Sequence, residues 1–251
     1  MRDITDYEKK YVDGPFEKTM ADIRRRRVTG QIGDTTNKSV LEVGCGMHPL
    51  FLDLDNYKNM VIVEPGSDFC NNAEKTDAFR AAGSRIKILQ GFLEDKIEDI
   101  ISLNIQFDII VVSSLLHEVE DPHRLLASVR AVCADNTVVH VNVPNARSLH
   151  RLIAYEGGMI SSPYEKSALQ KNLQQHSTYD MERLTEDVRR AGFAVISRGS
   201  YFIKPFTHGQ MQRMLDDNII SEQVLEGLDK ITEYLPEYGA EIYVNLKRDD
   251  V

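Results

Sequence analysis

Short apolar runs alternate with helical patterns over the middle of the chain. The apolar runs, most of them nearly continuous Val, Ile and Leu, lie at residues 39–43, 60–64, 86–90, 107–112 and 137–143. Runs of this composition are typical of strands that are buried on both faces of a sheet. Helical patterns lie at 67–82 and 122–134, and the second begins with Pro122 behind the capping residue Asp121. This alternation predicts an α/β fold with a doubly wound, mostly parallel sheet.

The two ends of the chain have a different pattern. Residues 1–30 are charged and helical in pattern, with a break at Gly14-Pro15. After residue 145 we expect a helix at 145–155, a polar loop region at 156–177, a helix at 177–191 capped by Ser177 or Thr178, a strand at 193–203, a helical segment at 207–234 broken near Asn218, and a last strand at 241–246. The pattern therefore divides the chain into an N-terminal helical cap (1–38), a core (39–145), and a region that covers the site and completes the sheet (146–251).

Composition narrows the class of protein. The chain has 251 residues, a net charge of −9 and three cysteines, Cys45, Cys70 and Cys133. Phosphate backbones repel an acidic protein, so we expect no nucleic-acid partner. The cysteine spacing fits neither a disulfide framework nor a zinc site, and no signal-peptide core or bilayer-spanning run is found. We therefore predict a soluble, cytoplasmic protein without a membrane partner.

Two glycines follow directly on the first expected strand, within the segment Ser39 to Gly46. Gly44 and Gly46 lack a Cβ atom, which lets a ligand approach the backbone closely. The third glycine typical of dinucleotide sites is absent, because Met47-His48-Pro49 comes next. Glu42 is unusual on a buried strand, and it either anchors the loop or faces the cationic amino group of a bound amino-acid moiety. The alternative for the whole segment is an ordinary strand-to-helix turn.

Two further strand ends carry candidate nucleotide contacts. Glu64 ends the second expected strand, where a carboxylate can accept hydrogen bonds from both hydroxyls of a ribose. The alternative is a solvated charge at a strand end. After the third strand comes Gly91-Phe92-Leu93-Glu94, in which Phe92 or Leu93 can sandwich an adenine ring. Phe92 can equally belong to the hydrophobic core.

The segment around the fourth expected strand completes a known pattern. It runs from Phe107 through Ser113 and His117 to Asp121-Pro122. Together with the glycine turn and Glu64, this order over residues 39–143 resembles the class I S-adenosylmethionine-dependent methyltransferases. The resemblance implies a Rossmann-like sheet of seven strands with an antiparallel last strand and a helical lid, and S-adenosyl-L-methionine as cofactor, with S-adenosyl-L-homocysteine as product. It implies cofactor contacts at Tyr11, Glu42, Gly44, Cys45, Gly46, Glu64, Pro65, Gly91, Phe92, Leu93 and Ser113.

A second resemblance lies downstream. The segment 141–150, His176 ahead of a helix, Ala191-Gly192-Phe193, and residues 201–206 with Gln210-Met211 are similar to ubiquinone-type and other small-molecule O-methyltransferases. Some enzymes of this kind act in cell-surface sugar and secondary-metabolite pathways. The resemblance does not name an acceptor.

Methyl transfer to a hydroxyl needs a group that removes a proton, and histidine is the natural base. His117 lies just past the fourth strand, and His176 lies in the region expected to contact the acceptor. We take these two residues as candidate bases, with Asn145 as a third candidate catalytic residue. The alternatives are a pocket-shaping role for His117 and a surface position for His176.

Polar side chains after the fifth strand are candidate acceptor contacts. Asn142 and Asn145 bracket Pro144, and their amides can bind a polyhydroxyl compound. Arg147 and Lys204 can bind an anionic group such as phosphate. The alternatives are a helix-capping role for Asn145 and solvated side chains for the two cations.

Two other features point to structural roles. The four consecutive arginines at 24–27 cannot form one helix face and are typical of a solvated helix end. Asp108 has no partner in sequence that would complete a metal motif, so we expect it to be structural and the protein to need no metal.

The sequence therefore predicts an S-adenosylmethionine-dependent O-methyltransferase of a small polar metabolite, such as a sugar or sugar nucleotide of cell-surface polysaccharide biosynthesis, active as a monomer or homodimer. The alternatives are N-methylation of a small amine, a noncatalytic cofactor-binding protein of the same fold, and an NAD-linked dehydrogenase. The missing third glycine disfavours the dehydrogenase.

Overall fold

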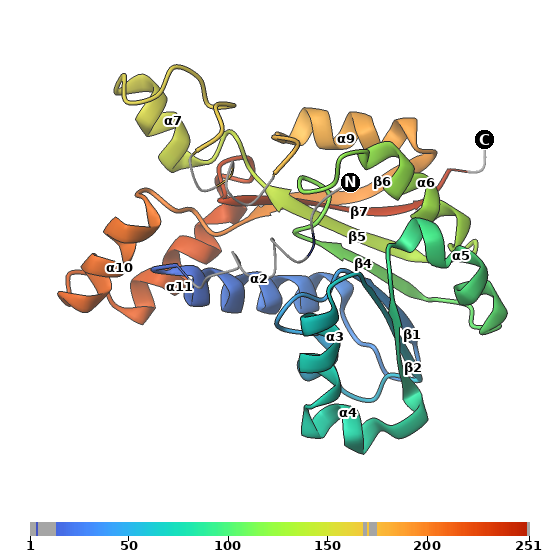
Figure 1. The fold of residues 1–251 in the computed structure, drawn as a ribbon. Helices are drawn as coiled ribbons and strands as arrows, with labels where there is room; N and C mark the ends of the chain where they lie inside the picture. Colours follow the sequence, from blue (N-terminus) through green and yellow to red (C-terminus); the bar gives the residue numbers. More distant parts are fainter. Residues whose placement is uncertain (1–3, 5–13, 168–169, 171–174, 250–251) are drawn as a thin grey trace.

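A seven-stranded sheet forms the centre of the protein (Figure 1). The structure is a computed structural model that describes residues 4, 14–167, 170 and 175–249. The strands are β1 (Ser39–Val43), β2 (Asn59–Glu64), β3 (Ile86–Gln90), β4 (Ile109–Ser113), β5 (Val138–Pro144), β6 (Phe193–Tyr201) and β7 (Glu241–Arg248). Their order is β3-β2-β1-β4-β5-β7-β6, and β7 runs antiparallel to both of its neighbours. The predicted doubly wound, mostly parallel sheet with an antiparallel last strand is confirmed.

Helices cover both faces of this sheet. On one face lie α5 (Leu93–Ser102), α6 (Pro122–Ala131) and α9 (Met181–Arg190), and on the other lie α2 (Glu17–Ile32), α3 (Ser67–Glu74) and α4 (Asp77–Ala82). The helices α7 (Leu149–Glu156), α10 (His208–Asp216) and α11 (Glu222–Lys230) extend the molecule beyond one end of the sheet (Figure 1). Short 3-10 turns stand at Leu50–Leu52, Gly83–Arg85 and Ile231–Glu233.

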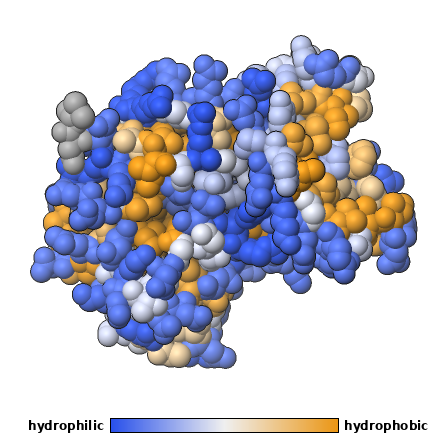
Figure 2. All heavy atoms as spheres, turned by 180° about the vertical axis from the view of Figure 1, so that it is seen from behind, coloured by the Kyte–Doolittle hydropathy of each residue, from blue (hydrophilic) through white to orange (hydrophobic). Residues whose placement is uncertain are grey.

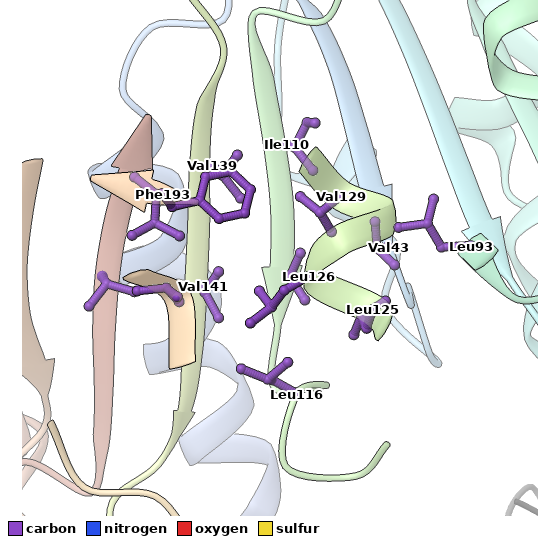
Figure 3. Packing of buried hydrophobic residues seen from close by; sticks show 14 of the residues in the cluster. Val43, Leu93, Ile110, Leu116, Leu125, Leu126, Val129, Val139, Val141 and Phe193 are labelled. Atoms are coloured by element: carbon purple, nitrogen blue, oxygen red, sulfur yellow. The ribbon is translucent and has the colours of Figure 1, made fainter. Parts of the chain in front are cut away.

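The larger core cluster lies between the sheet and α5, α6 and α9. Val129 of α6 lies beside Ile110 of β4, and Leu126 lies toward Val141 of β5, with all four side chains buried (Figure 3). Fully burying one such aliphatic side chain contributes about 1.5–3 kcal/mol relative to exposure. This packing fixes β4 and β5, and therefore the loops that leave their carboxyl ends.

The interpretation of residues 24–27 as a solvated helix end is wrong. These arginines lie in the middle of α2, and each of them pairs with a carboxylate from a distant part of the chain. The pairs are Arg24 with Glu241, Arg25 with Asp53, and Arg26 and Arg27 with Asp229. Four consecutive helical residues point in different directions, so α2 contacts several elements at once.

Several predicted element boundaries are corrected. The expected helix at 67–82 is two helices, because Thr76 accepts a hydrogen bond from the Phe79 amide and caps a new start. The helix α5 was not predicted. Asp180 caps α9, so neither Ser177 nor Thr178 does so. The expected break near Asn218 is confirmed, and this residue has φ +54° between α10 and α11.

Hydrophobic residues also reach the surface at the end of the molecule that carries α7 and α10, on the right in Figure 2. Met159 and Ile219 are the most exposed aliphatic side chains there. Within the described ranges, no helix has the length and apolar character needed to cross a membrane.

Candidate active site

A cavity of about 950 Å³ opens along the carboxyl ends of β1, β2 and β4. Small-molecule sites generally have volumes of roughly 300–1,000 Å³, so this cavity has room for a nucleotide-sized ligand and a small second molecule. One end is lined by the turns after β1, β2 and β3, and the other by residues from α2, α7, the loop before α10, and β7. The carboxyl ends of parallel strands are where open α/β sheets bind ligands.

The two glycines of the turn after β1 are required for different structural reasons. Both are left-handed, with φ +78° at Gly44 and φ +53° at Gly46. A Cβ atom on Gly44 would lie 3.2 Å from Cδ2 of Leu115, whereas a Cβ atom on Gly46 would meet nothing within 4 Å. Close approach of a ligand to the backbone is therefore possible at Gly46, while Gly44 makes room for the protein's own side chain.

Glu42 anchors the loop that follows this turn. Its two carboxylate oxygens accept hydrogen bonds from the Leu50 amide at 2.9 and 3.1 Å. The carboxyl group is buried at the edge of the cavity, and burial raises its pKa from 4.5 to about 8. Of the two roles predicted for Glu42, these contacts show the first, which is to anchor the loop.

Glu64 holds two turns together at the end of β2. One oxygen accepts from the Gly46 amide at 3.1 Å and the other from the Gly66 amide at 2.8 Å. The residue is 4% exposed, which contradicts the alternative of a solvated strand-end charge. Burial raises its pKa, and the two backbone hydrogen bonds oppose that shift. Glu64 also lines the cavity, so a ligand bound there lies within reach of its carboxylate.

The third turn supplies an apolar wall. Gly91 has φ +147°, and its amide donates to the Glu64 carbonyl at 3.0 Å, which ties this turn to the second. Phe92 is half-buried, lines the cavity and lies outside the core clusters, whereas Leu93 belongs to the core cluster and begins α5. The cavity brings together ten of the predicted cofactor residues: Glu42, Gly44, Cys45, Gly46, Glu64, Pro65, Gly91, Phe92, Leu93 and Ser113. The eleventh, Tyr11, lies outside the described residues.

The two candidate bases have different positions. His117 is buried and lines the cavity. His176 contributes its backbone amide, which donates to the His117 carbonyl at 3.0 Å, but it is not among the lining residues. Gln175 and Ser177 on either side of it do line the cavity. The fold therefore brings His117, and not His176, to the site.

Two predicted acceptor contacts do not reach the cavity. Asn142 is fully buried inside the sheet, where its amide nitrogen donates to Glu241 at 2.7 Å, so the prediction that it points into the crevice is wrong. Arg147 also lies outside the cavity lining. Asn142 belongs to β5 and turns away from the cavity, whereas Arg147 lies in the turn that follows β5.

Asn145 lines the cavity but is fully engaged with the protein. Its amide nitrogen donates to the carbonyls of Glu237 and Gly239, both at 2.9 Å, and its oxygen accepts from the Arg147 amide. The bond to the residue two positions ahead is an Asx turn. The expected helix cap is absent, since α7 begins at Leu149. The contacts of Asn145 are those of a residue that shapes the end of β5.

The far end of the cavity holds polar residues that the sequence interpretation did not assign as acceptor contacts. Lys204 lies there as predicted, and beside it are Glu17, Arg24, His150, His208 and Glu241. The spacing of these residues gives no signal, because they come from α2, α7, α10 and β7 and meet only in the folded chain. Burial lowers the pKa of His150 to about 2 and of His208 to about 4, so both imidazoles are neutral at pH 7.

His140 was also not singled out. It is buried within β5, 2.7 Å from the side-chain oxygen of Asn245 and 2.9 Å from the hydroxyl of Tyr201. Burial lowers its pKa to about 4. A neutral imidazole with these partners is a core residue. Among the described residues, no group of three His, Cys, Asp or Glu side chains is arranged to hold a metal ion.

These turns fit S-adenosylmethionine. The buried Glu64 carboxylate, the accessible Gly46 backbone and the half-buried Phe92 ring line the same end of the cavity. The strand order and the position of the cavity are those of the S-adenosylmethionine-dependent methyltransferase fold. The chain matches the family described as methyltransferase domain over residues 16–198, and it belongs to that family.

Solved structures share the whole fold. A possible histamine N-methyltransferase from Thermotoga maritima superposes with a TM-score of 0.59 at 16% identity, covering 97% of this chain and 99% of its own. The plantazolicin methyltransferase BamL, solved with S-adenosylhomocysteine, gives 0.55 at 12% identity, covering 94% and 88%. The [4+2]-cyclase SpnF gives 0.58 at 15% identity, covering 95% and 84%. No curated protein sequence matches the chain. Identities this low show the fold alone, and the cyclase is a reminder that one fold hosts different reactions.

Proposed function

We propose that this protein transfers the methyl group of S-adenosylmethionine to an oxygen of a small polar metabolite, such as a sugar or sugar nucleotide. The observation that carries the proposal is the single cavity that joins the donor turns at Gly46 and Glu64 to the polar end around Lys204. A donor and an acceptor bound in one cavity meet with their relative orientation fixed, and this orientation supplies much of the rate of a bimolecular transfer.

The residues of the donor end have distinct tasks. Glu64 would bind the ribose, Phe92 would pack on the adenine, and Glu42 would fix the loop and face the amino group of the methionine moiety. Bound S-adenosylmethionine supplies an electrophilic methyl group on a sulfonium. The residues after β5 and the region 156–206 would form the lid over the acceptor, within the proposed acceptor-binding region 146–251.

His117 is the proposed base. It is buried in the cavity wall beyond β4, and its carbonyl binds the amides of His176 and Ser177. These hydrogen bonds hold the backbone of His117 against the segment that contains His176 and Ser177. His150 and His208 have pKa values far below 7, and such weak bases would remove a hydroxyl proton poorly.

The test begins with binding and continues with turnover. Calorimetry of the full chain with S-adenosylhomocysteine should show stoichiometric binding, and the absence of binding would refute the donor site. With an acceptor found by screening sugars, sugar nucleotides, phenols and amines, His117→Gln should lower kcat by about 10²–10⁴-fold, the usual range for a general base. His176→Gln is the matched control and should leave kcat within a few-fold of the parent. Equal losses in both variants would contradict the assignment.

N-methylation is the second candidate. The low pKa values of two cavity histidines favour an acceptor that needs little help from a base, and a neutral amine is such an acceptor. An amine substrate whose kcat is unchanged by His117→Gln would replace the O-methylation proposal. A cytoplasmic location and a monomeric or homodimeric state remain predictions.

A further inference from the structure

Lys204 is a buried cation at the polar end of the cavity. The residue is 5% exposed and lines the cavity wall. Within the described residues, no carboxylate oxygen lies within 4.0 Å of its ammonium nitrogen, and its side chain makes no hydrogen bond. The Lys204 ammonium thus lies in the cavity wall without a protein partner among the described residues, and an anionic ligand or ion can complete it.

The backbone holds Lys204 in place. The amide of Ile203 donates to the Leu228 carbonyl at 2.8 Å, and the Lys204 carbonyl accepts from the His150 amide at 3.1 Å. Two residues before it, Phe202 is buried with φ +53°. The segment is therefore tied to α11 on one side and to α7 on the other, and the side chain leaves a fixed point on the cavity wall.

The nearest carboxylates are committed to another cation. Glu241 binds Arg24 at 2.6 Å through one oxygen and the amide of Asn142 at 2.7 Å through the other. Glu17 lies 3.7 Å from Arg24 and 3.7 Å from His208. Burial lowers the pKa of Lys204 to about 8, and the fields of Glu17 and Glu241 oppose that shift. Lys204 is thus mostly charged at pH 7.

None of the other described groups around Lys204 pairs directly with its ammonium. His150 of α7 and His208 of α10 are neutral at pH 7. Arg151 of α7 is a further cation, and its guanidinium donates to the carbonyls of Pro163 and Glu165. The charges that face Lys204 are therefore two carboxylates and the two arginines, and the Lys204 ammonium is the one that has no partner among the described residues.

We propose that the acceptor carries one carboxylate or phosphate group, which Lys204 binds at the end of the cavity remote from the donor turns. This inference rests on the proposed function, because it assumes that the acceptor fills this end of the cavity. An ammonium binds either anion as a point charge, so the site selects for charge, and the neutral imidazoles of His150 and His208 add hydrogen bonds without adding charge. Uncharged sugars and amines would then be poor acceptors.

The experiment uses the full chain saturated with S-adenosylhomocysteine and titrated with small probes in a calorimeter. The probes are inorganic phosphate, acetate, glucose 6-phosphate and glucuronate, with glucose as the neutral match. At least one anionic probe should bind about 10-fold or more tightly than glucose, since a charge-assisted hydrogen bond is worth about that factor. The phosphate and carboxylate arms distinguish the two sources of the charge. Anionic probes that bind no tighter than glucose at millimolar concentration would overturn the proposal.

Three variants assign the effect. Lys204→Met, which keeps the length of the side chain and removes the charge, should lower anion affinity to the level of glucose, whereas Lys204→Arg should restore most of it. Lys58→Met is the matched control, because Lys58 is exposed at the amino end of β2 on the opposite edge of the sheet. Unchanged anion affinity in Lys204→Met would refute the assignment.

Two readouts separate this inference from the proposed function. Lys204→Met should bind S-adenosylhomocysteine as the parent does, and a 10-fold loss of that affinity would mean that Lys204 serves the donor, which contradicts the inference. Failure of the parent itself to bind S-adenosylhomocysteine would refute the proposed function. At pH 8.5, anion binding should take up protons in the parent and none in Lys204→Arg, because arginine is already protonated. Equal proton uptake would overturn the role of Lys204.

Discussion

Replacement of Glu42 by glutamine should stabilise the protein at neutral pH. In the folded chain, burial raises the pKa of Glu42 to about 8, whereas an unfolded glutamate has a pKa of 4.5. Between these two values the folded chain keeps a proton that the unfolded chain has lost. The contribution of Glu42 to the free energy of unfolding is therefore fully present below pH 4.5 and is lost as the pH rises from 4.5 to 8. Glutamine carries no such charge and retains an oxygen to accept the hydrogen bond from Leu50.

The size of the effect follows from the same values. One pH unit is worth about 1.36 kcal/mol, and pH 7 lies about 2.5 units above the unfolded pKa, so the cost is roughly 3 kcal/mol at pH 7. At pH 5 the cost is below about 1 kcal/mol. Glu42→Gln should thus exceed the parent in free energy of unfolding by these amounts.

Urea denaturation of both proteins at pH 5 and pH 7 measures this difference. Glu98→Gln is the control, since Glu98 is exposed on α5 and should give the same gap at both pH values. A gap between parent and Glu42→Gln that does not widen with pH would refute the reasoning. If Glu42 faces the amino group of the donor, binding of S-adenosylmethionine at pH 7 should also release a proton, and Glu42→Gln should abolish that release.

Three further outcomes are expected. Gly46→Ala should lower the free energy of unfolding by about 1 kcal/mol, because its backbone is left-handed, and should weaken the binding of S-adenosylhomocysteine. Gly44→Ala should lower the free energy of unfolding further, because its Cβ also meets Leu115. Equal binding of S-adenosylhomocysteine by the parent and Gly46→Ala would exclude close approach of the ligand to the Gly46 backbone. Asp229→Asn, which weakens the ion pairs to α2, should lower the free energy of unfolding by about 1–3 kcal/mol in a urea titration, and no loss would mean that those pairs contribute nothing. All three cysteines are buried, and burial raises the pKa of Cys45 and Cys133. Ellman's reagent should therefore react slowly with the folded protein at pH 8 and rapidly with all three thiols in urea. A thiol that reacts rapidly in the folded protein would contradict this prediction.

The sheet could be predicted because its strands carry a local signal. The runs at 39–43 and 86–90 are recovered with the predicted boundaries; the first is buried at every position, whereas β3 is the edge strand and buries only Ile86 fully. The helix α5 lies outside the predicted elements because its cap Phe92 and its first residue Leu93 fit a ligand contact equally well in sequence. In the structure Leu93 is both the first residue of a helix and a part of the core.

The two ends of the site differ in how far the sequence predicts them. The proposed donor end is built from turns that directly follow single strands, so the position of Gly46, Glu64 and Gly91 along the chain predicts that they share one cavity. The acceptor end is assembled from helices and a strand that are distant in sequence. Asn142 lies at a strand end as predicted, yet its side chain faces the interior of the sheet and binds Glu241. Which of two faces a side chain occupies depends on strand pairing, which the sequence alone does not reveal.

The paired arginines of α2 have a consequence for how the two ligands affect each other. Arg25 holds Asp53 and the His48 carbonyl beside the donor turn, and the next residue toward the amino end, Arg24, holds Glu241 at the acceptor end. Arg24 and Arg25 are adjacent on α2, so a shift of this part of the helix would change both contacts. The affinity for the acceptor should therefore change when the donor binds, and thermodynamic reciprocity requires the donor's affinity to change by the same factor. Cooperative binding of the two substrates would then follow from two neighbouring residues of α2.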